Sequence, residues 1–218
     1  MEFPTKKYSS IAPGLIGEVF TFKAKERTMK DSRTHAELIE KAYQLGFDYE
    51  KKYRGCSQCA LAAIYDTLDF KDDNVFQAAT GFAGGGGLTG ISVCGGYSAG
   101  VMAISQLCGR KRSNFEDPEG IRFKSFELVR EFTRQYIEDL GSIICRDIQI
   151  RFFGRPYYIA DPDEFAKFEA AGGHDDKCTE VVGRATRLAG GRPPCRRRGP
   201  CDEPALTPGS LSTACAGR

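Results

Sequence analysis

Residues 32–68 read SRTHAELIEKAYQLGFDYEKKYRGCSQCALAAIYDTL, and this stretch decides the fold class. Its first half has apolar residues at three- and four-residue steps: Ala36, Ile39, Ala42, Tyr43 and Phe47. That spacing places them on one face and predicts an amphipathic helix from Ser32 to Tyr53. Residues 59–68 are apolar almost all round, which is typical of a buried helix. The polar residues 71–74 then indicate a turn.

The remainder of the chain continues this helical pattern. Helices are expected at residues 73–82, 95–107, 118–140, 162–171 and 176–188. A further short helix is expected after Ser142, which can cap it. The stretch 84–90, GGGGLTG, is too rich in glycine for regular structure and indicates a loop. No strand pattern competes, so we expect an all-α, compact multi-helix domain over residues 31–188.

The two ends of the chain have a different character. Residues 1–30 show no clear periodicity and are read as an extended arm. Residues 189–218 have the composition of a chain that cannot bury a core, and we expect this tail to be disordered. The composition changes abruptly, so a natural tail and an artefact of the reading frame both stay open.

Composition and charge exclude several classes of protein. A chain of 218 residues with 41% hydrophobic content is long enough for one sizeable core. Without residues 189–218, 26 basic residues face 27 acidic ones, which is not the basic footprint of a nucleic-acid-binding protein. No apolar run is long enough for a secretory signal or a membrane span. We therefore expect a cytoplasmic protein without membrane insertion.

The most informative residues are four cysteines at the beginnings of predicted helices. The chain has nine cysteines, a density below that of disulfide-stapled secreted domains. Four of them open a predicted helix: Cys59, Cys94, Cys145 and Cys178. A helix N-terminus stabilises a thiolate, the form that ligates metal or attacks a disulfide. The alternative, a buried cysteine acting as a small hydrophobe, is favoured for any one of them alone.

Three further residues are auxiliary candidates. Cys56 forms a C-x-x-C with Cys59, and is either an extra thiol that can substitute as fourth ligand or incidental. Gly95 directly follows Cys94 at a helix start. His174 lies four residues before Cys178 and either shares a helical face with it or is an exposed turn histidine, the reading we favour. Cys108 is expected in the core, and Cys195, Cys201 and Cys215 in the tail.

The glycine-rich loop suggests a role beside these cysteines. Residues 85–90 formally fit G-x-G-x-x-G, but no strand precedes them and no lysine follows as in a P-loop. A nucleotide site is therefore disfavoured. The glycines would instead let the backbone approach the cysteines and donate N–H bonds to sulfur.

These motifs resemble the C_GCAxxG_C_C family of redox-active proteins, also described as C-GCAxxG-C-C family (seleno)proteins, over about residues 35–188. The first family cysteine resembles Cys59-Ala60, and the Cys-Gly-Ala-x-x-Gly motif resembles the stretch from Cys94 to Ala99. The two later cysteines correspond to Cys145 and Cys178. Gly96 and Ala99 depart from the family's Ala and Gly. The family is similar to the N-terminal domain of split-Soret cytochrome c, which implies a helical fold and a homodimer and offers an iron–sulfur site as one of the open alternatives.

Three functions remain open at this point. The first is an electron-transfer protein that holds an iron–sulfur cluster through Cys59, Cys94, Cys145 and Cys178, working with an unknown redox partner. The second is a metal-free thiol–disulfide protein, with Cys56 and Cys59 a candidate pair. The third is a structural zinc domain that serves as an interaction module. An oxidoreductase activity is compatible with the first two, but no reaction or substrate follows from the residues.

Overall fold

The computed structural model describes residues 34–190. The predicted arm at residues 1–30 and nearly all of the predicted tail lie outside this range. The described residues form helices and no strand, which confirms the all-α prediction. None of these helices has the length and apolar character of a membrane span. The α-helices are α2 (His35–Tyr53), α3 (Cys56–Leu68), α4 (Asp73–Ala78), α5 (Gly95–Cys108), α6 (Ile121–Leu140), α7 (Cys145–Phe153), α8 (Pro162–Ala170) and α9 (Cys178–Gly190).

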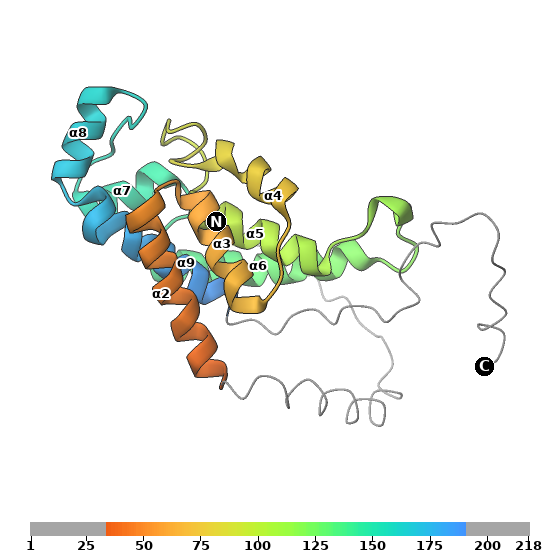
Figure 1. Ribbon diagram of the computed structural model, residues 1–218. Helices are drawn as coiled ribbons and strands as arrows, with labels where there is room; N and C mark the ends of the chain where they lie inside the picture. Colours follow the sequence, from red (N-terminus) through yellow and green to blue (C-terminus); the bar gives the residue numbers. More distant parts are fainter. Residues whose placement is uncertain (1–33, 191–218) are drawn as a thin grey trace, which may run out of the picture.

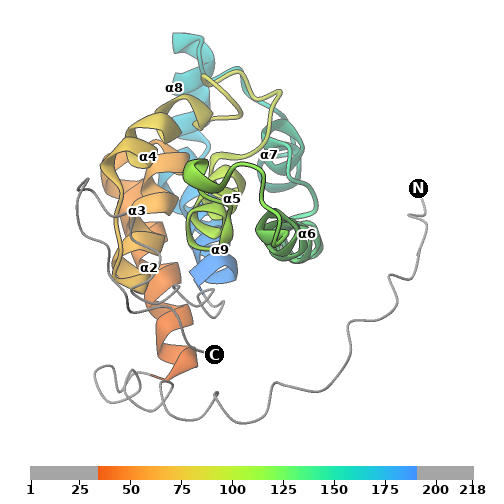
Figure 2. The same cartoon turned by 90° about the vertical axis from the view of Figure 1, so that its right-hand side faces the viewer.

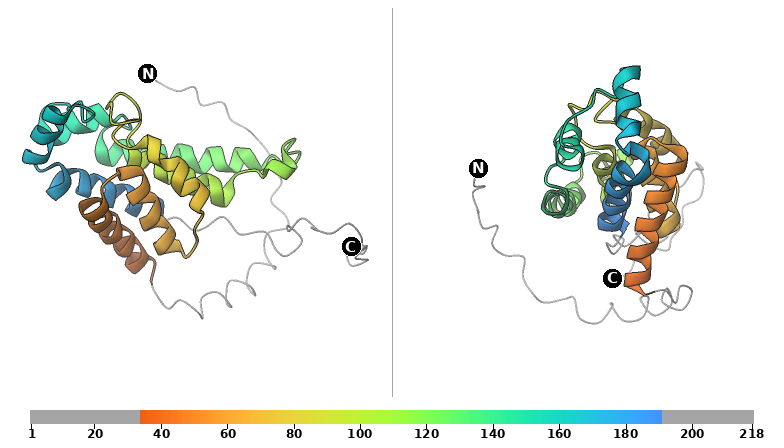
Figure 3. Two further views of the ribbon diagram at one scale, coloured as in Figure 1. Left: turned by 45° about the horizontal axis from the view of Figure 1, so that its top comes forward. Right: turned by 90° about the vertical axis from the view of Figure 1, so that its left-hand side faces the viewer.

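The helices form three layers (Figures 1 and 2). Helices α2, α3 and α4 make one side, α6 and α7 make the other, and α5 and α9 lie between them, as two further views also show (Figure 3). Helix α3 packs against α2, α5 and α9, so it is central to the core. Helix α8 extends from one end of the bundle (Figure 1).

Helix α2 begins three residues later than predicted. Thr34 is its N-cap, and the Thr34 hydroxyl accepts a hydrogen bond from the Glu37 N–H in a capping box. This reciprocal cap fixes the helix start more strongly than Ser32 could. Helix α2 packs closely on α9 because Gly46 has no side chain: a Cβ there would lie 2.4 Å from the Thr186 hydroxyl.

Small residues bring α5 close to α6. A Cβ on Gly100 would lie 2.3 Å from the Phe132 ring, and Ala99 and Ala103 are buried on the same helix. These small residues therefore allow the two helices to pack closely, whereas Ser105 on the same helix is exposed.

Helix α6, expected at residues 118–140, buries only the second half of its apolar face. Phe132, Tyr136 and Leu140 are fully buried, whereas Phe123 and Phe126 are more than half exposed. The first turns of α6 extend past the helices that would cover them (Figure 1). Local spacing therefore identified the face but not the length over which other helices contact it.

The last helices differ in detail from the prediction. Ser142 contacts the start of α7 through Ile144 N–H and Asp147, but the helix itself begins at Cys145. A π-helical turn, Gly173–Lys177, leads directly into α9, so no cap at Asp176 precedes Cys178. Helix α9 continues through Gly190, two residues beyond the predicted domain boundary at 188.

Candidate functional site

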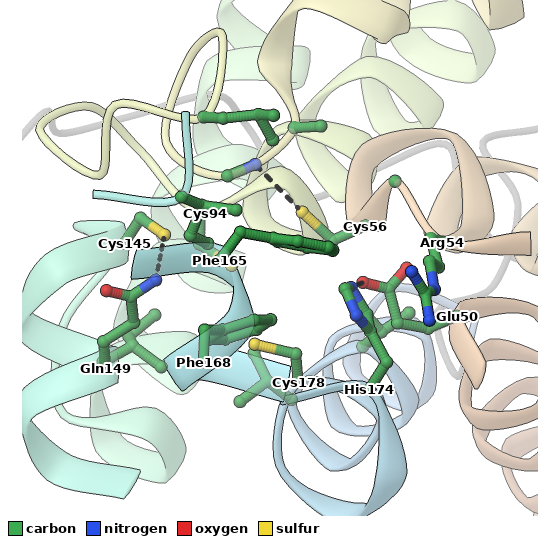
Figure 4. A pocket seen from close by; sticks show the side chains of 18 of the residues that line it. Glu50, Arg54, Cys56, Cys94, Cys145, Gln149, Phe165, Phe168, His174 and Cys178 are labelled. Carbon is green, nitrogen blue, oxygen red and sulfur yellow. Dashed lines mark hydrogen bonds and ion pairs between the residues drawn. The ribbon is translucent and has the colours of Figure 1, made fainter. Parts of the chain in front are cut away.

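Four thiols meet at one cavity of about 350 Å³ between the helix layers. They belong to Cys56, Cys94, Cys145 and Cys178, and none of them is in a disulfide. Cys56, Cys145 and Cys178 are the first residues of α3, α7 and α9, while Cys94 is the N-cap of α5. Figure 4 shows the four side chains around the cavity. Four helix beginnings therefore converge on one mostly apolar space.

Cys59 does not line this cavity. Helix α3 begins at Cys56, after the left-handed Gly55, so Cys59 lies one turn into the helix. Its buried thiol donates to the Arg54 carbonyl at 3.0 Å and faces the Tyr49 carbonyl at 3.4 Å. The structure thus brings together three of the four predicted cysteines, and the auxiliary Cys56 stands where Cys59 was expected.

A short backbone bridge places Cys94 beside Cys145. Val93 and Ile144 form an isolated antiparallel bridge. The Cys94 N–H donates to the Ile143 carbonyl at 2.7 Å, and the Cys145 N–H donates to the Ser92 carbonyl at 3.0 Å. These bonds hold the starts of α5 and α7 together, although the two cysteines are far apart in the sequence.

Two glycine positions allow the backbone to approach the thiols. A Cβ on Gly95 would lie 2.4 Å from the Cys56 sulfur, so only glycine fits at that helix start. In the glycine-rich loop, Gly84 has a φ of +57° and its N–H donates to the Cys56 sulfur at 3.4 Å. The predicted role of the loop as an N–H donor to sulfur is confirmed for Cys56. Gly96 likewise has no room for a side chain, because a Cβ there would lie 2.9 Å from the Ala185 methyl.

Side chains provide further donors on the other side of the cavity. The Gln149 amide faces the Cys145 sulfur at 3.8 Å, while its carbonyl accepts from the Tyr157 N–H at 2.8 Å. The Tyr136 hydroxyl is buried without an oxygen or nitrogen partner. Burial raises the pKa of Cys94, and the facing Tyr136 hydroxyl and the N–H groups of Gly96 and Tyr97 oppose that rise.

Burial favours the protonated form of the four thiols at neutral pH. Removal from water raises the pKa of Cys56, Cys94, Cys145 and Cys178, and neighbouring thiolates and Glu50 raise several of them further. The hydrogen bonds from the donors that face the sulfurs would be stronger if the thiols were ionised. A bound metal centre supplies the charge that deprotonates a coordinating thiol.

The spacing of the thiols bears on which metal group they suit. Within residues 34–190, no three His, Cys, Asp or Glu side chains converge closely enough to hold a single metal ion. A tetrahedral zinc site with Zn–S bonds of about 2.3 Å needs its sulfurs roughly 4 Å apart. The four thiols line a larger cavity, and a multi-atom iron–sulfur cluster, whose irons bind thiolates on different sides, does not need its sulfurs that close together.

A group of charged side chains lies beside the thiols. Figure 4 shows Glu50, Arg54 and His174 together, on the far side of the view from Cys94 and Cys145. The His174 Nε2 lies 3.6 Å from a Glu50 oxygen, and its Nδ1 is hydrogen-bonded to Glu169. Arg54 also pairs with Glu169, at 3.2 Å. The favoured reading of His174 as an exposed turn residue is wrong, because its side chain is only 13% exposed and lines the cavity.

Glu50 is the charged residue that the sequence analysis missed. Its side chain is 2% exposed, and burial raises its pKa to about 7. One of its carboxylate oxygens, Oε2, has no hydrogen-bond partner. A signal existed in the sequence: Glu50 follows Ala42 and Gly46 at four-residue steps, on the face of α2 that α9 covers. A carboxylate on the face of a helix that packs against the core is a candidate for a functional residue.

Two other residues also went unnoticed. Tyr136 is fully buried on α6, and its hydroxyl faces Cys94. Gln149 lies on α7, one turn after Cys145, and is 1% exposed. A Gln at the fourth position after a helix-opening cysteine is a weak signal, because most glutamines on helices face solvent.

Comparison with known proteins identifies the family. The family model described as "Putative redox-active protein (C_GCAxxG_C_C)" matches residues 54–191, which include all four cavity cysteines. The chain belongs to this family of redox-active proteins. No curated protein and no solved structure matches the chain.

Proposed function

We propose that Cys56, Cys94, Cys145 and Cys178 hold an iron–sulfur cluster and that the protein transfers single electrons through it. The observation that carries the proposal is the convergence of four free thiols on one mostly apolar cavity. A bound cluster would accept and release one electron. The chain's own residues would bind it, shield it from water and set the charge around it.

Donors at the sulfurs support this assignment. The Gly84 N–H faces Cys56, the Gln149 amide faces Cys145, and the Tyr136 hydroxyl faces Cys94. Hydrogen bonds to coordinating sulfurs stabilise the more negative, reduced state of a cluster. The same donors would be of little use to four protonated thiols, because a neutral thiol is a weak acceptor.

The thiol–disulfide alternative has less support. A reactive thiol needs a lowered pKa and access to solvent, whereas burial raises the pKa of these thiols. The two cysteines of the candidate pair also point to different places: Cys56 lines the cavity, whereas the Cys59 thiol donates to the Arg54 carbonyl. The spread of the thiols around the cavity likewise favours a cluster over a single zinc ion.

Anaerobic reconstitution of the full chain with iron and sulfide tests the proposal. We expect broad visible absorption that bleaches with dithionite, together with stoichiometric iron and acid-labile sulfide. The Cys94→Ser variant should lose this absorption while keeping its helical circular dichroism. A wild-type protein that stays colourless after reconstitution would contradict the proposal. Tight binding of one redox-inert zinc ion would instead favour a structural site, and loss of two titratable thiols on oxidation would favour a dithiol.

A further inference from the structure

The cavity has a carboxylate side that electron transfer does not require. Glu50 lines the cavity and is 2% exposed, yet its Oε2 atom has no hydrogen-bond partner. An unpaired polar group away from water is costly, and more so when it is charged. A ligand that supplies a donor to this oxygen would remove the cost.

The neighbouring side chains do not satisfy this oxygen. His174 binds Glu169 through Nδ1, and its Nε2 lies 3.6 Å from Glu50, beyond hydrogen-bond distance. Arg54 pairs with Glu169, and its side chain is 53% exposed. The Cys59 thiol also faces the Glu50 carboxylate as a hydrogen-bond neighbour, but it has one proton, whose shortest contact is with the Arg54 carbonyl at 3.0 Å, and Oε2 stays without a partner. Glu50 is therefore a buried acceptor that these neighbours leave open.

Aromatic rings border the same side of the cavity. Phe165 and Phe168 line it, with ring centroids 6.3 Å and 5.2 Å from that of His174. Figure 4 shows both rings between Cys145 and the charged group in this view, with Cys56 and Cys178 next to the rings. Aromatic faces attract organic cations, most strongly where water is excluded. A carboxylate beside aromatic rings is thus a combination that recognises a positively charged amine.

We propose that the Glu50 side of the cavity binds a small organic cation, a protonated amine attached to an apolar or aromatic body. The amine donates to Glu50 Oε2 and its apolar part lies against Phe165 and Phe168, at the end of the cavity away from Cys94 and Cys145. The cavity volume of about 350 Å³ is at the lower end of the range for small-molecule sites, roughly 300 to 1,000 Å³.

An entrance to this site exists at the protein surface. Tyr53 and Leu88 both line the cavity, and they are 62% and 39% exposed. The ligand site thus reaches solvent between the end of α2 and the glycine-rich loop. It depends on Glu50 and the aromatic rings, and not on the cluster. Its failure and the failure of the cluster proposal can therefore be told apart.

Calorimetric titration of the metal-free full chain at pH 8 tests the inference, with benzylamine as the probe. We expect benzylamine to bind at least about tenfold more tightly than benzyl alcohol, which has the same ring and no charge. Benzoate should not bind, because its charge is opposite. Equal binding of the amine and the alcohol would overturn the inference, as would the absence of amine binding.

Variants locate the binding. Glu50→Gln should weaken benzylamine binding about tenfold or more, and Phe165→Leu should weaken it several-fold through the loss of one ring face. Glu180→Gln is the matched control, because Glu180 accepts from Tyr43 and does not line the cavity. Its affinity should equal that of the wild type. Unchanged affinity in a folded Glu50→Gln protein would overturn the inference even if Phe165→Leu binds less well.

A further variant separates the two proposals. Cys94→Ser should keep benzylamine binding within about twofold while it abolishes the cluster. Amine binding that disappears in a Cys94→Ser protein with wild-type melting behaviour would place the amine elsewhere and overturn the inference. The melting temperature of each variant is measured first, so that loss of fold is recognised.

Discussion

The two sides of the first turn of α3 differ sharply, although each carries a cysteine. Cys56 faces the cavity, where it accepts the Gly84 N–H and lies against Gly95. Cys59, three residues later, faces α2 and donates to the Arg54 carbonyl. Residues three apart on a helix are neighbours, so a modest rotation around the axis separates the two environments. A helix start is therefore not enough to define a site cysteine, because the direction of the side chain decides what it meets.

The turn between α2 and α3 explains the role of Cys59. Arg54 and Gly55 both have positive φ values, 61° and 86°. In this tight connection the Arg54 carbonyl has the Cys59 thiol as a donor. Cys59 therefore stabilises the turn that aims Cys56 at the cavity, which gives it a structural role beside the site.

The largest expected effect comes from exchanging the two cysteines separately for serine. Cys56→Ser should remove essentially all reconstituted iron–sulfur absorption, because it removes a ligand. Cys59→Ser should retain most of it, since serine still offers a donor to the Arg54 carbonyl. Iron and sulfide assays on the two purified variants measure the difference. Cluster loss in Cys59→Ser, with retention in Cys56→Ser, would reverse our assignment and restore the ligand set predicted from the sequence.

The next effect concerns Glu50, which lines the cavity and also faces Cys59, so that burial and then Glu50 raise the pKa of the Cys59 thiol. Burial raises the Glu50 pKa from 4.5 to about 7, so the folded protein holds a proton that the unfolded chain releases between these values. The free energy of unfolding should therefore fall as pH rises from about 4.5 to 7, by roughly 3 kcal/mol from this group.

Glu50→Gln should lose this dependence and be more stable relative to wild type at pH 8 than at pH 4.5. Urea unfolding of both metal-free proteins across that range gives the measurement. If the free energy of unfolding changed with pH in the same way in both proteins, folding would not raise the pKa of Glu50.

A substitution on the cavity side should have a comparable but smaller cost. Gly95→Ala places a methyl group 2.4 Å from the Cys56 sulfur, so either the helix start or the thiol must shift. Overpacking of this kind costs about 1–3 kcal/mol. Gly81→Ala is the matched control, because a Cβ there meets no atom within 4 Å. Denaturant unfolding compares the two, and equal stability would mean that Cys56 does not lie against Gly95.

The smallest effect should come from Tyr136→Phe. Loss of the hydroxyl that opposes the burial of Cys94 should raise the pKa of this thiol further. Its alkylation at pH 9 in the metal-free protein should slow, by less than about tenfold, since one pKa unit changes the thiolate fraction tenfold. Mass spectrometry of the Cys94 peptide follows the rate. A faster reaction in the variant would contradict the assigned contact.

Local patterns in the sequence predicted much of this fold. The helix predicted at 118–140 ends at Leu140 before the left-handed Gly141, as expected, although it begins only at Ile121. The helix predicted at 162–171 begins at Pro162 after its Asp161 cap and ends at Ala170. Glycine, proline and capping residues act within a few positions of themselves, so their effects can be read without knowing the partners. The prediction failed where a start depended on packing, as at the π-helical turn before Cys178.

The candidate site was predicted less completely. Cys94, Cys145 and Cys178 were placed at helix starts, and the structure brings them to one cavity. Cys56 was kept as an auxiliary thiol, while Glu50 was not considered. Both errors have the same cause: in the sequence, neither residue reveals which helix it will face.

The sequence by itself determined the helices, the loop of glycines and the cysteines at helix starts, because these follow from periodicity and backbone preferences over a few residues. Only the tertiary structure decided which thiols share a cavity and which carboxylate is buried beside them. Those outcomes depend on how α2, α3, α5 and α9 pack and on the backbone bridge between the starts of α5 and α7. The close contacts at Gly46 and Gly95 allow this packing, and such contacts join residues far apart in the chain.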